Sequence, residues 1–432
     1  MRFSNVFLFE FNHFKRSRSK LITYLIFLFA CIYSIYSGFD LQDKQFNTID
    51  NIQLDQKKQV MQVSKFFQNL SIEPYAIDIL GYIPTYGIKK PSPLFPLGIG
   101  QAEQYGYYKK ITTWSSTYDN DMVEELANPE RLVNGNIDFS FLVIFLLPIL
   151  LIIFTYNIRG FEQDARFEKL IAIQCGSIRK WVFIRFLFYV LLLILTVIGF
   201  VIAVSIMNNA VIDYMGEISS LILLLSSYIV FFGLIFYLII LKSHGSSTIA
   251  FKMMSVWLLF CIIIPGSVHQ IASMVYPVHY MTDYLDANRK ETYEVFDLPN
   301  DSLYLKLLDV YPDLEQTQYA QNNSINQKFV RNAISAIVND MNKRAISKIE
   351  DKNEEKNQFI RGSYWFNPVS FIQNKWNSYI STDYYAYRDY RIEIQAILDK
   401  KLELLNFEAW NDKTVSKLTY ETYLKDLKVS LD

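Results

Sequence analysis

The chain has 432 residues, of which 51% are hydrophobic and 20% are charged, and its mean hydropathy is +0.12. This composition is too polar for a protein that lies almost wholly in a membrane, and its apolar residues are too clustered for a soluble one. The net charge of −1 gives no basic field, which argues against a nucleic-acid partner. The three cysteines, Cys31, Cys175 and Cys261, fall in or beside apolar runs, so we expect no disulfide in the polar stretches.

The N-terminal segment, residues 1–20, repeats phenylalanine at helical spacing and ends in basic residues. The phenylalanines and the basic residues are Phe3, Phe7, Phe11, Phe14, Lys15, Arg16, Arg18 and Lys20. This pattern predicts an amphipathic helix on the membrane surface, with its basic end among lipid headgroups. A cleaved signal peptide is the alternative, but the apolar run that follows is too long and lacks a small-residue cleavage site.

Five apolar runs are long enough to cross a membrane as helices. They are residues 21–38, 139–156, 181–207, 219–241 and 253–273. Leu, Ile, Val and Phe dominate the second run, and each of these side chains contributes roughly −0.3 to −0.6 kcal/mol to insertion at the bilayer centre. The sequence therefore predicts a mainly α, polytopic membrane protein with about five transmembrane helices.

Charged residues at the ends of these runs predict the orientation. The N-terminal segment, the connector at 157–180 and the loop around Lys242 are basic, whereas the loop with Asp213 and Glu217 is acidic. By the positive-inside rule the basic segments are cytoplasmic. Two extracytoplasmic lobes follow from this topology, and they comprise residues 39–138 and 276–432.

The two predicted lobes differ in pattern. Polar residues 41–70 favour a helix, and the Pro- and Gly-rich stretch at 84–106 predicts ordered loops packed by aromatic side chains. The second lobe has two apolar stripes at helical spacing. Their residues are Val330, Ile334, Ile337, Met341 and Ala345, then Tyr387, Tyr390, Ile394, Ile397, Leu402 and Leu405. We favour two helices packed on each other over a projecting coiled coil, with charged residues 350–356 as a helix end or hinge.

The sequence predicts no catalytic, cofactor-binding or metal-binding residues in this chain. It has no phosphate-binding Gly-x-x-x-x-Gly-Lys-Ser/Thr loop, and Gly98 with Gly100 lacks the third glycine of a dinucleotide site. The four histidines do not have metal-ligand spacing, and His269 and His279 are expected at the outer end of the last span. No Asp or Glu falls in the apolar runs, so a proton-coupled transporter would lack its usual carboxylate. Any energy source is therefore expected in another subunit.

The connector at 157–180 combines charges of both signs with apolar side chains, which is typical of a docking element. The candidate coupling residues are Phe161, Glu162, Asp164, Arg166, Phe167, Glu168 and Lys169. A solvated loop that only joins two helices is one alternative. Packing of Phe161 and Phe167 against the membrane or the neighbouring spans is another.

Three stretches, residues 91–114, 126–164 and 367–391, resemble the ABC-2 type permeases that carry a DUF3526 region and are common in Bacteroidota. The matching positions in the last stretch are Pro368, Gln373, Asn377, Thr382, Asp383 and Tyr387. The resemblance implies a multi-pass protein of the bacterial inner membrane and a cytoplasmic ABC ATPase partner that binds ATP and Mg²⁺. It also implies a dimer with a second permease copy or paralogue, and the connector as coupling helix.

The chain departs from this family in two places. After the acidic pair of the connector the family usually has Gly-Thr-Leu, whereas this chain has Arg166, Phe167 and Glu168. Family members usually close with a sixth span, and no run after Ser273 is apolar enough for one, so either the chain ends outside or a C-terminal piece is missing.

Two functions from different classes are compatible with these features. One is an exporter permease, for which Ser226, Ser227, Tyr228 and Tyr237 offer polar lining for a conduit. The other is an ABC-powered mechanotransmitter, whose outer lobes act on cell-envelope partners without moving cargo through the membrane. A signalling or scaffold protein is a third possibility, for which we would expect a recognisable cytoplasmic domain.

Overall fold

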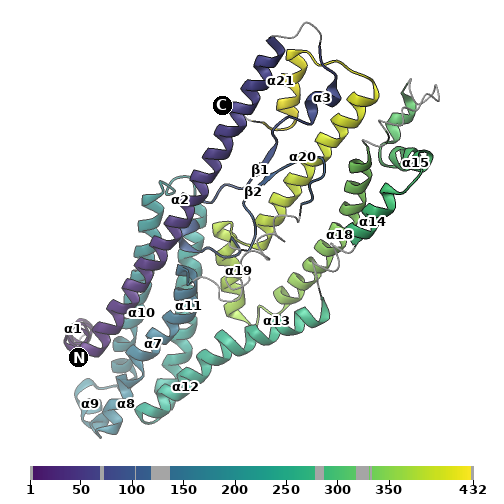
Figure 1. Cartoon of the computed structure of the whole chain (residues 1–432). Helices are drawn as coiled ribbons and strands as arrows, with labels where there is room; N and C mark the ends of the chain where they lie inside the picture. The colour runs from purple at the N-terminus through teal and green to yellow at the C-terminus, as the bar shows by residue number, and fades with distance from the viewer. Residues whose placement is uncertain are drawn as a thin grey trace.

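The computed structural model describes residues 3–68, 73–102, 104–117, 137–277, 287–317, 330 and 333–429 (Figure 1). The described part is mainly α-helical, as predicted. Its membrane-side elements are α1 (Phe3–Arg16), α2 (Arg18–Gln68), α6 (Phe139–Phe141), η2 (Leu142–Leu146), α7 (Leu147–Thr155), α8 (Asn157–Asp164), α9 (Glu168–Cys175), α10 (Ile178–Met207), α11 (Met215–Lys242), α12 (Ser246–Leu258), η3 (Leu259–Ile263) and α13 (Ile264–Val275). The other elements are α3 (Ala76–Leu80), β1 (Tyr86–Ile88), η1 (Phe95–Leu97), β2 (Tyr108–Lys110), α14 (Ala287–Phe296), α15 (Asn300–Val310), η5 (Pro312–Gln316), α18 (Ile334–Gly362), α19 (Pro368–Ile380), α20 (Tyr384–Trp410) and α21 (Lys417–Asp426).

Five helical stretches of the described residues are long and apolar enough to cross a membrane, which confirms the predicted number. They are Arg18–Lys65, Phe139–Asp164, Ile178–Met207, Met215–Lys242 and Ser246–Val275. The helices extend beyond the apolar runs at their charged ends, because a helix continues through charged residues that can reach water or headgroups.

The first span does not end at Gly38, where the apolar run ends. Instead α2 is one unbroken helix of 51 residues that runs along the length of the molecule (Figure 1). At 1.5 Å per residue this is about 75 Å, more than twice the thickness of a bilayer core. Gly38 lies inside this helix, where a Cβ atom would approach the Cα of Pro96 in η1 to 2.7 Å. The glycine therefore serves close packing rather than helix termination.

Two spans contain a π-helical turn just before a proline. The turn η2 precedes Pro148, and η3 precedes Pro265. Since proline has no N–H, the carbonyl four residues earlier loses its helical partner, and for Pro148 this carbonyl belongs to Ile144. The hydroxyl of Tyr228 in α11 donates to it over 2.5 Å. A neighbouring span thus satisfies the acceptor that the proline leaves free.

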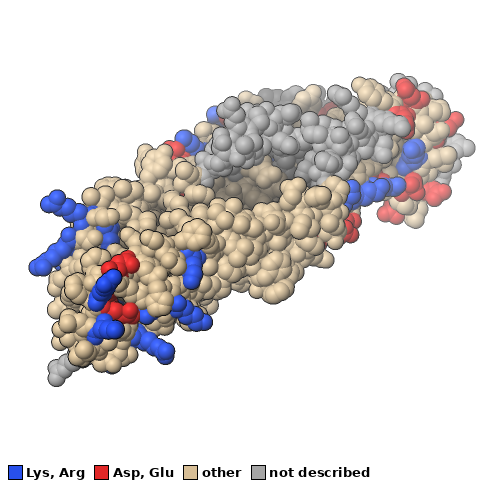
Figure 2. All heavy atoms as spheres, turned by 90° about the horizontal axis from the view of Figure 1, so that it is seen from below, with Lys and Arg blue, Asp and Glu red and all other residues tan. Residues whose placement is uncertain are grey.

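One end of the molecule is basic. The N-terminus, α8, α9 and the start of α12 lie together at the end opposite the C-terminal helix α21 (Figure 1). Seen from below, Lys and Arg crowd the left end, with few Asp or Glu atoms among them (Figure 2). Exposed basic residues of these elements and their flanks include Lys15, Arg16, Arg18, Arg166, Lys169, Arg179, Lys180, Lys242 and Lys252. We call this region the basic end.

The outer segments that we predicted as two lobes share their cores. Ile111, beside β2, packs with Ile394 of α20. Val60 in the outer half of α2 packs with Tyr420 of α21. The small ribbon β1–β2 is antiparallel, and Gly87 of β1 lies so close to α20 that a Cβ would meet the Ile394 side chain at 2.6 Å. The two predicted lobes are therefore packed together, because helices of the second cover apolar faces of the first.

The two apolar stripes of the second outer segment face different partners rather than each other. Ile334 and Ile337 of α18 pack against Leu303 and Leu307 of α15, while the stripe of α20 faces Ile111. Where α18 and α20 meet, the contacts are polar, as between Asn339, Gln395 and Asp399 or between Glu350 and Arg391. The charged residues 350–356 lie within α18 and form part of this contact, so they are not a helix end or hinge.

Candidate functional site

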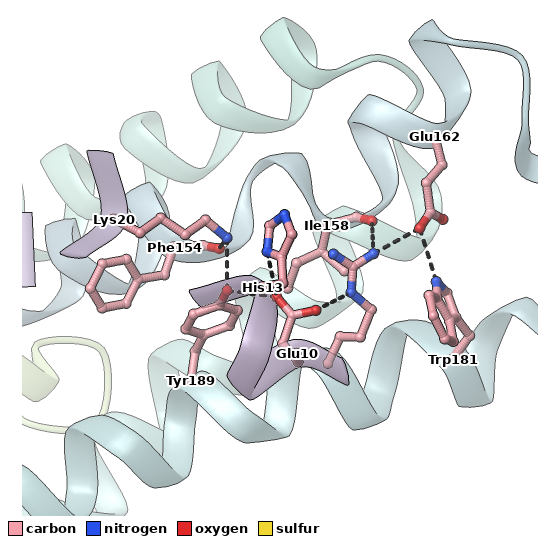
Figure 3. Close-up of polar contacts among 9 residues, drawn as sticks. Glu10, His13, Lys20, Phe154, Ile158, Glu162, Trp181 and Tyr189 are labelled. Atoms are coloured by element: carbon pink, nitrogen blue, oxygen red, sulfur yellow. Dashed lines mark hydrogen bonds and ion pairs between the residues drawn. The ribbon is translucent and has the colours of Figure 1, made fainter. Parts of the chain in front are cut away.

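The basic end encloses a cluster of charged side chains that joins three helices (Figure 3). Arg185 of α10 bonds to Glu10 of α1 and to Glu162 of α8, the latter over 2.7 Å between Nη1 and Oε1. The Glu10 side chain is completely buried, and those of Arg185 and Glu162 are 8% and 9% exposed. The Trp181 indole N–H also donates to Glu162, over 3.0 Å. We call these four residues, with Tyr189 and Lys20, the buried polar network.

The network continues from Glu10 toward the first span. The Tyr189 hydroxyl donates to Glu10 over 2.6 Å and accepts from the Lys20 ammonium over 2.9 Å. Lys20 also donates to the backbone oxygen of Phe154 over 2.7 Å. The two carboxylates and two cations balance in formal charge, which a buried group of ions requires if it is to remain charged.

Spacings of four residues explain how the network forms. Trp181, Arg185 and Tyr189 lie one helical turn apart and face the same side of α10. Val6, Glu10 and Phe14 do the same on α1 and are all buried, and Ile158 and Glu162 do so on α8. Rings of α1 and α10 pack beside the ions, as with Phe7 and Phe188 at 5.2 Å between centroids.

The electrostatic environment keeps Glu10 ionised. Burial by itself raises the pKa of this carboxyl, but the His13 hydrogen bond, the Arg185 guanidinium and the Tyr189 hydroxyl together lower the pKa to about 2. The opposing contributions show that the carboxylate is stable only while its partners are in place. The ionised state of Glu10 therefore depends on the packing of α1 against α10.

The connector forms a hairpin of two short helices, α8 and α9, that is fixed to the bundle. Arg159 of α8 pairs with Glu168 of α9 over 2.7 Å and donates to the backbone oxygens of Ile240 and Leu241 at the end of α11. A Cβ on Gly160 would come within 2.6 Å of the Ser246 Cα, so α8 packs closely on the start of α12. The hairpin is thereby attached to α10, α11 and α12.

The outer face of the hairpin is apolar and exposed. Phe161 is 64% exposed, Phe167 57% and Ile173 84%, and no residue of α9 is buried. Among the predicted coupling residues, Phe161, Phe167, Arg166 and Lys169 lie on the surface. A solvent-exposed apolar face beside basic groups is suited to contact with another protein or with lipid.

Three acidic residues of the predicted docking set have partners within the chain. Glu162 is buried in the network, so it is not exposed on the outer face of the hairpin. Glu168 pairs with Arg159, and Asp164 accepts from the backbone N–H of Ser246 over 3.2 Å. Glu162 and Asp164 thus attach the hairpin to α10 and α12, whereas the pair of Glu168 with Arg159 joins the two helices of the hairpin itself.

Arg166 occupies the turn between α8 and α9 with φ of +62°. This left-handed conformation suits glycine and strains a residue that carries a Cβ. The family that the sequence resembles usually has glycine at this position. In this chain Arg166 therefore replaces glycine where the backbone of the hairpin is left-handed and strained.

The matched positions of the last stretch lie at the junction of α19 and α20. Pro368 is the first residue of α19, Gln373 is exposed, and Asp383 caps α20 by accepting from the Ala386 N–H over 3.2 Å. Thr382 lies in the turn between the two helices, Asn377 in the last part of α19 and Tyr387 in the first turn of α20. The backbone of Thr382 accepts from Gln101, and a Cβ on Gly100 would meet its hydroxyl at 2.5 Å. These residues fix the junction to the 98–101 loop.

The sequence interpretation missed the core of the network. Glu10 lies inside the segment predicted as a surface helix and is not singled out there, and Arg185 lies only just before the uncharged run that starts at Phe186. Lys20, which was expected among headgroups, is buried instead. The four-residue repeat of Trp, Arg and Tyr from position 181 was the available signal. His279 and residues 118–136, which include part of the matched stretch 126–164, lie outside the described residues.

Three of the four polar residues proposed to line a conduit have partners inside the chain. Tyr228 donates to Ile144, Ser227 donates to the backbone oxygen of Leu224 in its own helix, and Tyr237 donates to that of Arg179. These contacts are typical of helix packing in membranes.

Comparisons with protein-family models, curated proteins and solved structures found no match for this chain.

Proposed function

We propose that this chain is the transmembrane permease subunit of an ABC transporter of the ABC-2 type. The partner would be a separate cytoplasmic ATPase, and a second permease copy or paralogue would complete the complex in the bacterial inner membrane. The observation that carries the proposal is the exposed apolar face of the α8–α9 hairpin, supported from behind by buried ions. The positive-inside rule makes the basic end cytoplasmic, on the side where ATP is available.

The geometry favours the hairpin as the element that receives force. Phe161 and Phe167 project from it, whereas Arg159 and Glu162 attach it to α11 and α10. Arg185 extends this attachment to α1. A displacement of the hairpin by an ATPase would therefore move several helices together rather than a free loop.

The second candidate is mechanotransmission, and the unbroken α2 favours it. This helix joins the basic end to the outer cores, with Phe14 and Tyr24 in ring contact at one end and Phe67 against Tyr420 at the other. A continuous helix is a stiff connection between membrane and envelope. The hydroxyls of Tyr228 and Tyr237 add support, because both donate to backbone oxygens of neighbouring helices rather than facing a conduit.

Combined replacement of Phe161 and Phe167 by alanine tests the docking surface. Truncation of an interface anchor typically costs about 2 kcal/mol, which corresponds to roughly a thirtyfold loss of affinity. We expect the tagged, membrane-inserted double variant to lose the co-purifying ATPase and its ATP turnover. The matched control is Phe251→Ala on α12, which removes a phenylalanine that is 74% exposed and should retain both.

Unchanged co-purification and turnover in the inserted double variant would remove the hairpin as docking site and leave lipid contact as its role.

Mechanotransmission is tested separately with Leu54→Pro, an exposed position in the outer half of α2. If α2 transmits force, ATP-driven changes in spin-label distances between α2 and α18 should vanish in this variant while ATP turnover persists. Persistence of those changes would argue against the second candidate.

A further inference from the structure

A polar pocket lies where the last span meets the outer helices. It has a volume of about 460 Å³, within the range of roughly 300–1,000 Å³ that is usual for small-molecule sites. Four helices contribute to its wall, with His269 from α13, Asn357 from α18, Asn374 from α19 and Tyr384 from α20. These helices converge in the middle of the molecule, far from the basic end (Figure 1).

Side-chain amides form one part of the polar wall, beside ionisable side chains, a serine and tyrosine hydroxyls. The carboxamides are those of Gln101, Asn357, Asn374 and Asn377. The buried oxygens of Gln101 and Asn377 have no hydrogen-bond partner in the protein. An unpaired buried acceptor costs about 1–3 kcal/mol, but these two oxygens are closed to solvent, so a ligand in the pocket reaches them only after the side chains turn.

The charged groups of the pocket are largely compensated. The Arg361 guanidinium lies 4.6 Å from the centre of the Tyr385 ring and 3.9 Å from Glu354. Asp383 caps α20, and burial raises the pKa of its carboxyl. Lys375 is exposed to solvent. This balance favours a neutral ligand, because neither a net anion nor a net cation would find an uncompensated buried counter-charge.

The chemistry of the wall selects among neutral ligands. Carboxamides both donate and accept hydrogen bonds, as hydroxyl groups do. Tyr364 and Phe371 add an apolar surface, with ring centroids 5.4 Å apart in an edge-to-face arrangement. We propose that this pocket binds a small neutral carbohydrate of one or two sugar rings, whose hydroxyls pair with the amides and whose apolar face meets the rings.

The position of the pocket links such a ligand to the membrane helices. Phe371, Asn374 and Asn377 line it from one face of α19. The opposite face of α19 places Ile372 and Trp376 in the same core as the spans. Binding therefore acts on a helix that is packed into the bundle, and the inference does not depend on the proposed ATPase.

Calorimetric titration of the purified full-length chain tests the proposal. The detergent must lack a sugar headgroup, because maltoside or glucoside would compete for the pocket. The titrants are glucose, N-acetylglucosamine and maltose, compared with glutamate, lysine and inorganic phosphate. We expect saturable binding of at least one sugar and none of the charged solutes; binding of charged solutes only, or of none of the six, overturns the proposal.

Asn377→Leu locates the site, since it keeps the size of the side chain and removes the amide. We expect at least a tenfold loss of sugar affinity, with the melting temperature of the sugar-free protein unchanged or raised because an unpaired oxygen is gone. The control is Asn411→Leu, at the exposed end of α20, which should bind sugar normally. If Asn377→Leu fails to fold, Gln101→Met removes the other unpaired oxygen. Wild-type sugar affinity in either folded pocket variant would overturn the assignment.

Discussion

Two sets of carboxylate–arginine contacts among the described residues contain pairs that differ in burial. At the basic end, Glu10, Glu162 and Arg185 are almost fully buried. Between α18 and α20, the side chains of Arg388 and Glu354 are 32% and 30% exposed. An exposed pair contributes little because water solvates each ion separately, whereas breaking a buried pair leaves an ion in a medium that cannot solvate it. Breaking an ion pair at the basic end is therefore expected to cost more stability than breaking the exposed pair between α18 and α20.

The largest effect is expected from Arg185→Ala. It leaves Glu10 and Glu162 buried without their cation, a change that typically costs about 3–5 kcal/mol. We expect a corresponding loss in the free energy of unfolding, measured by denaturant titration of the detergent-solubilised protein. Arg179→Ala is the control, because Arg179 lies on the same helix but is exposed and should change the value little. Equal effects of the two variants would break the comparison.

Acid should also lower the stability of the protein, because it protonates Glu10 and removes one charge of the buried polar network. Its pKa is lowered from 4.5 to about 2, so the folded state holds this proton less tightly than the unfolded state does. The resulting stabilisation is present above pH 4.5 and is lost as the pH falls toward 2, over a span worth about 3 kcal/mol. We expect the unfolding free energy of the wild type to fall by this additional amount relative to Glu10→Gln across that window. Parallel pH curves for the two proteins would contradict it.

The pair of outer arginines gives a smaller and graded effect. The Arg391 side chain is 5% exposed and bonds to Glu350 over 2.9 Å, so Arg391→Ala should destabilise the chain more than Arg388→Ala. For Arg388→Ala we expect less than about 1 kcal/mol, and that small loss should shrink further in high salt. A loss of several kcal/mol for Arg388→Ala would show that burial is not what separates the two regions.

The smallest effect concerns the backbone of the hairpin. Arg166→Gly replaces a residue held at φ of +62° by one that adopts this conformation without strain. We expect a gain of up to about 1 kcal/mol in the free energy of unfolding. The measurement is the same denaturant titration, with Lys169→Gly as control; this exposed position in α9 should lose stability instead. A loss in Arg166→Gly would show that its side chain matters more than its backbone.

The sequence by itself determined the helical class, the number of spans and the exposed apolar face of the connector. These features follow from local periodicity and from uninterrupted apolar length, which a chain carries in any context. Phe161 and Phe167 could be identified as surface candidates because they alternate with charged residues. The ordered loops at 84–106 followed in the same way from their Pro and Gly content.

Only the tertiary structure decided which residues meet. Glu10 bonds to Arg185, which lies 175 positions later in the chain. Through Arg185 it is linked to Glu162, which lies 152 positions after Glu10. No local pattern encodes such a distance, because an amphipathic face shows that a side is buried and not what buries it. The same reason explains the shared outer cores and the continuous α2, where Gly38 signals an end in sequence but a close contact in space.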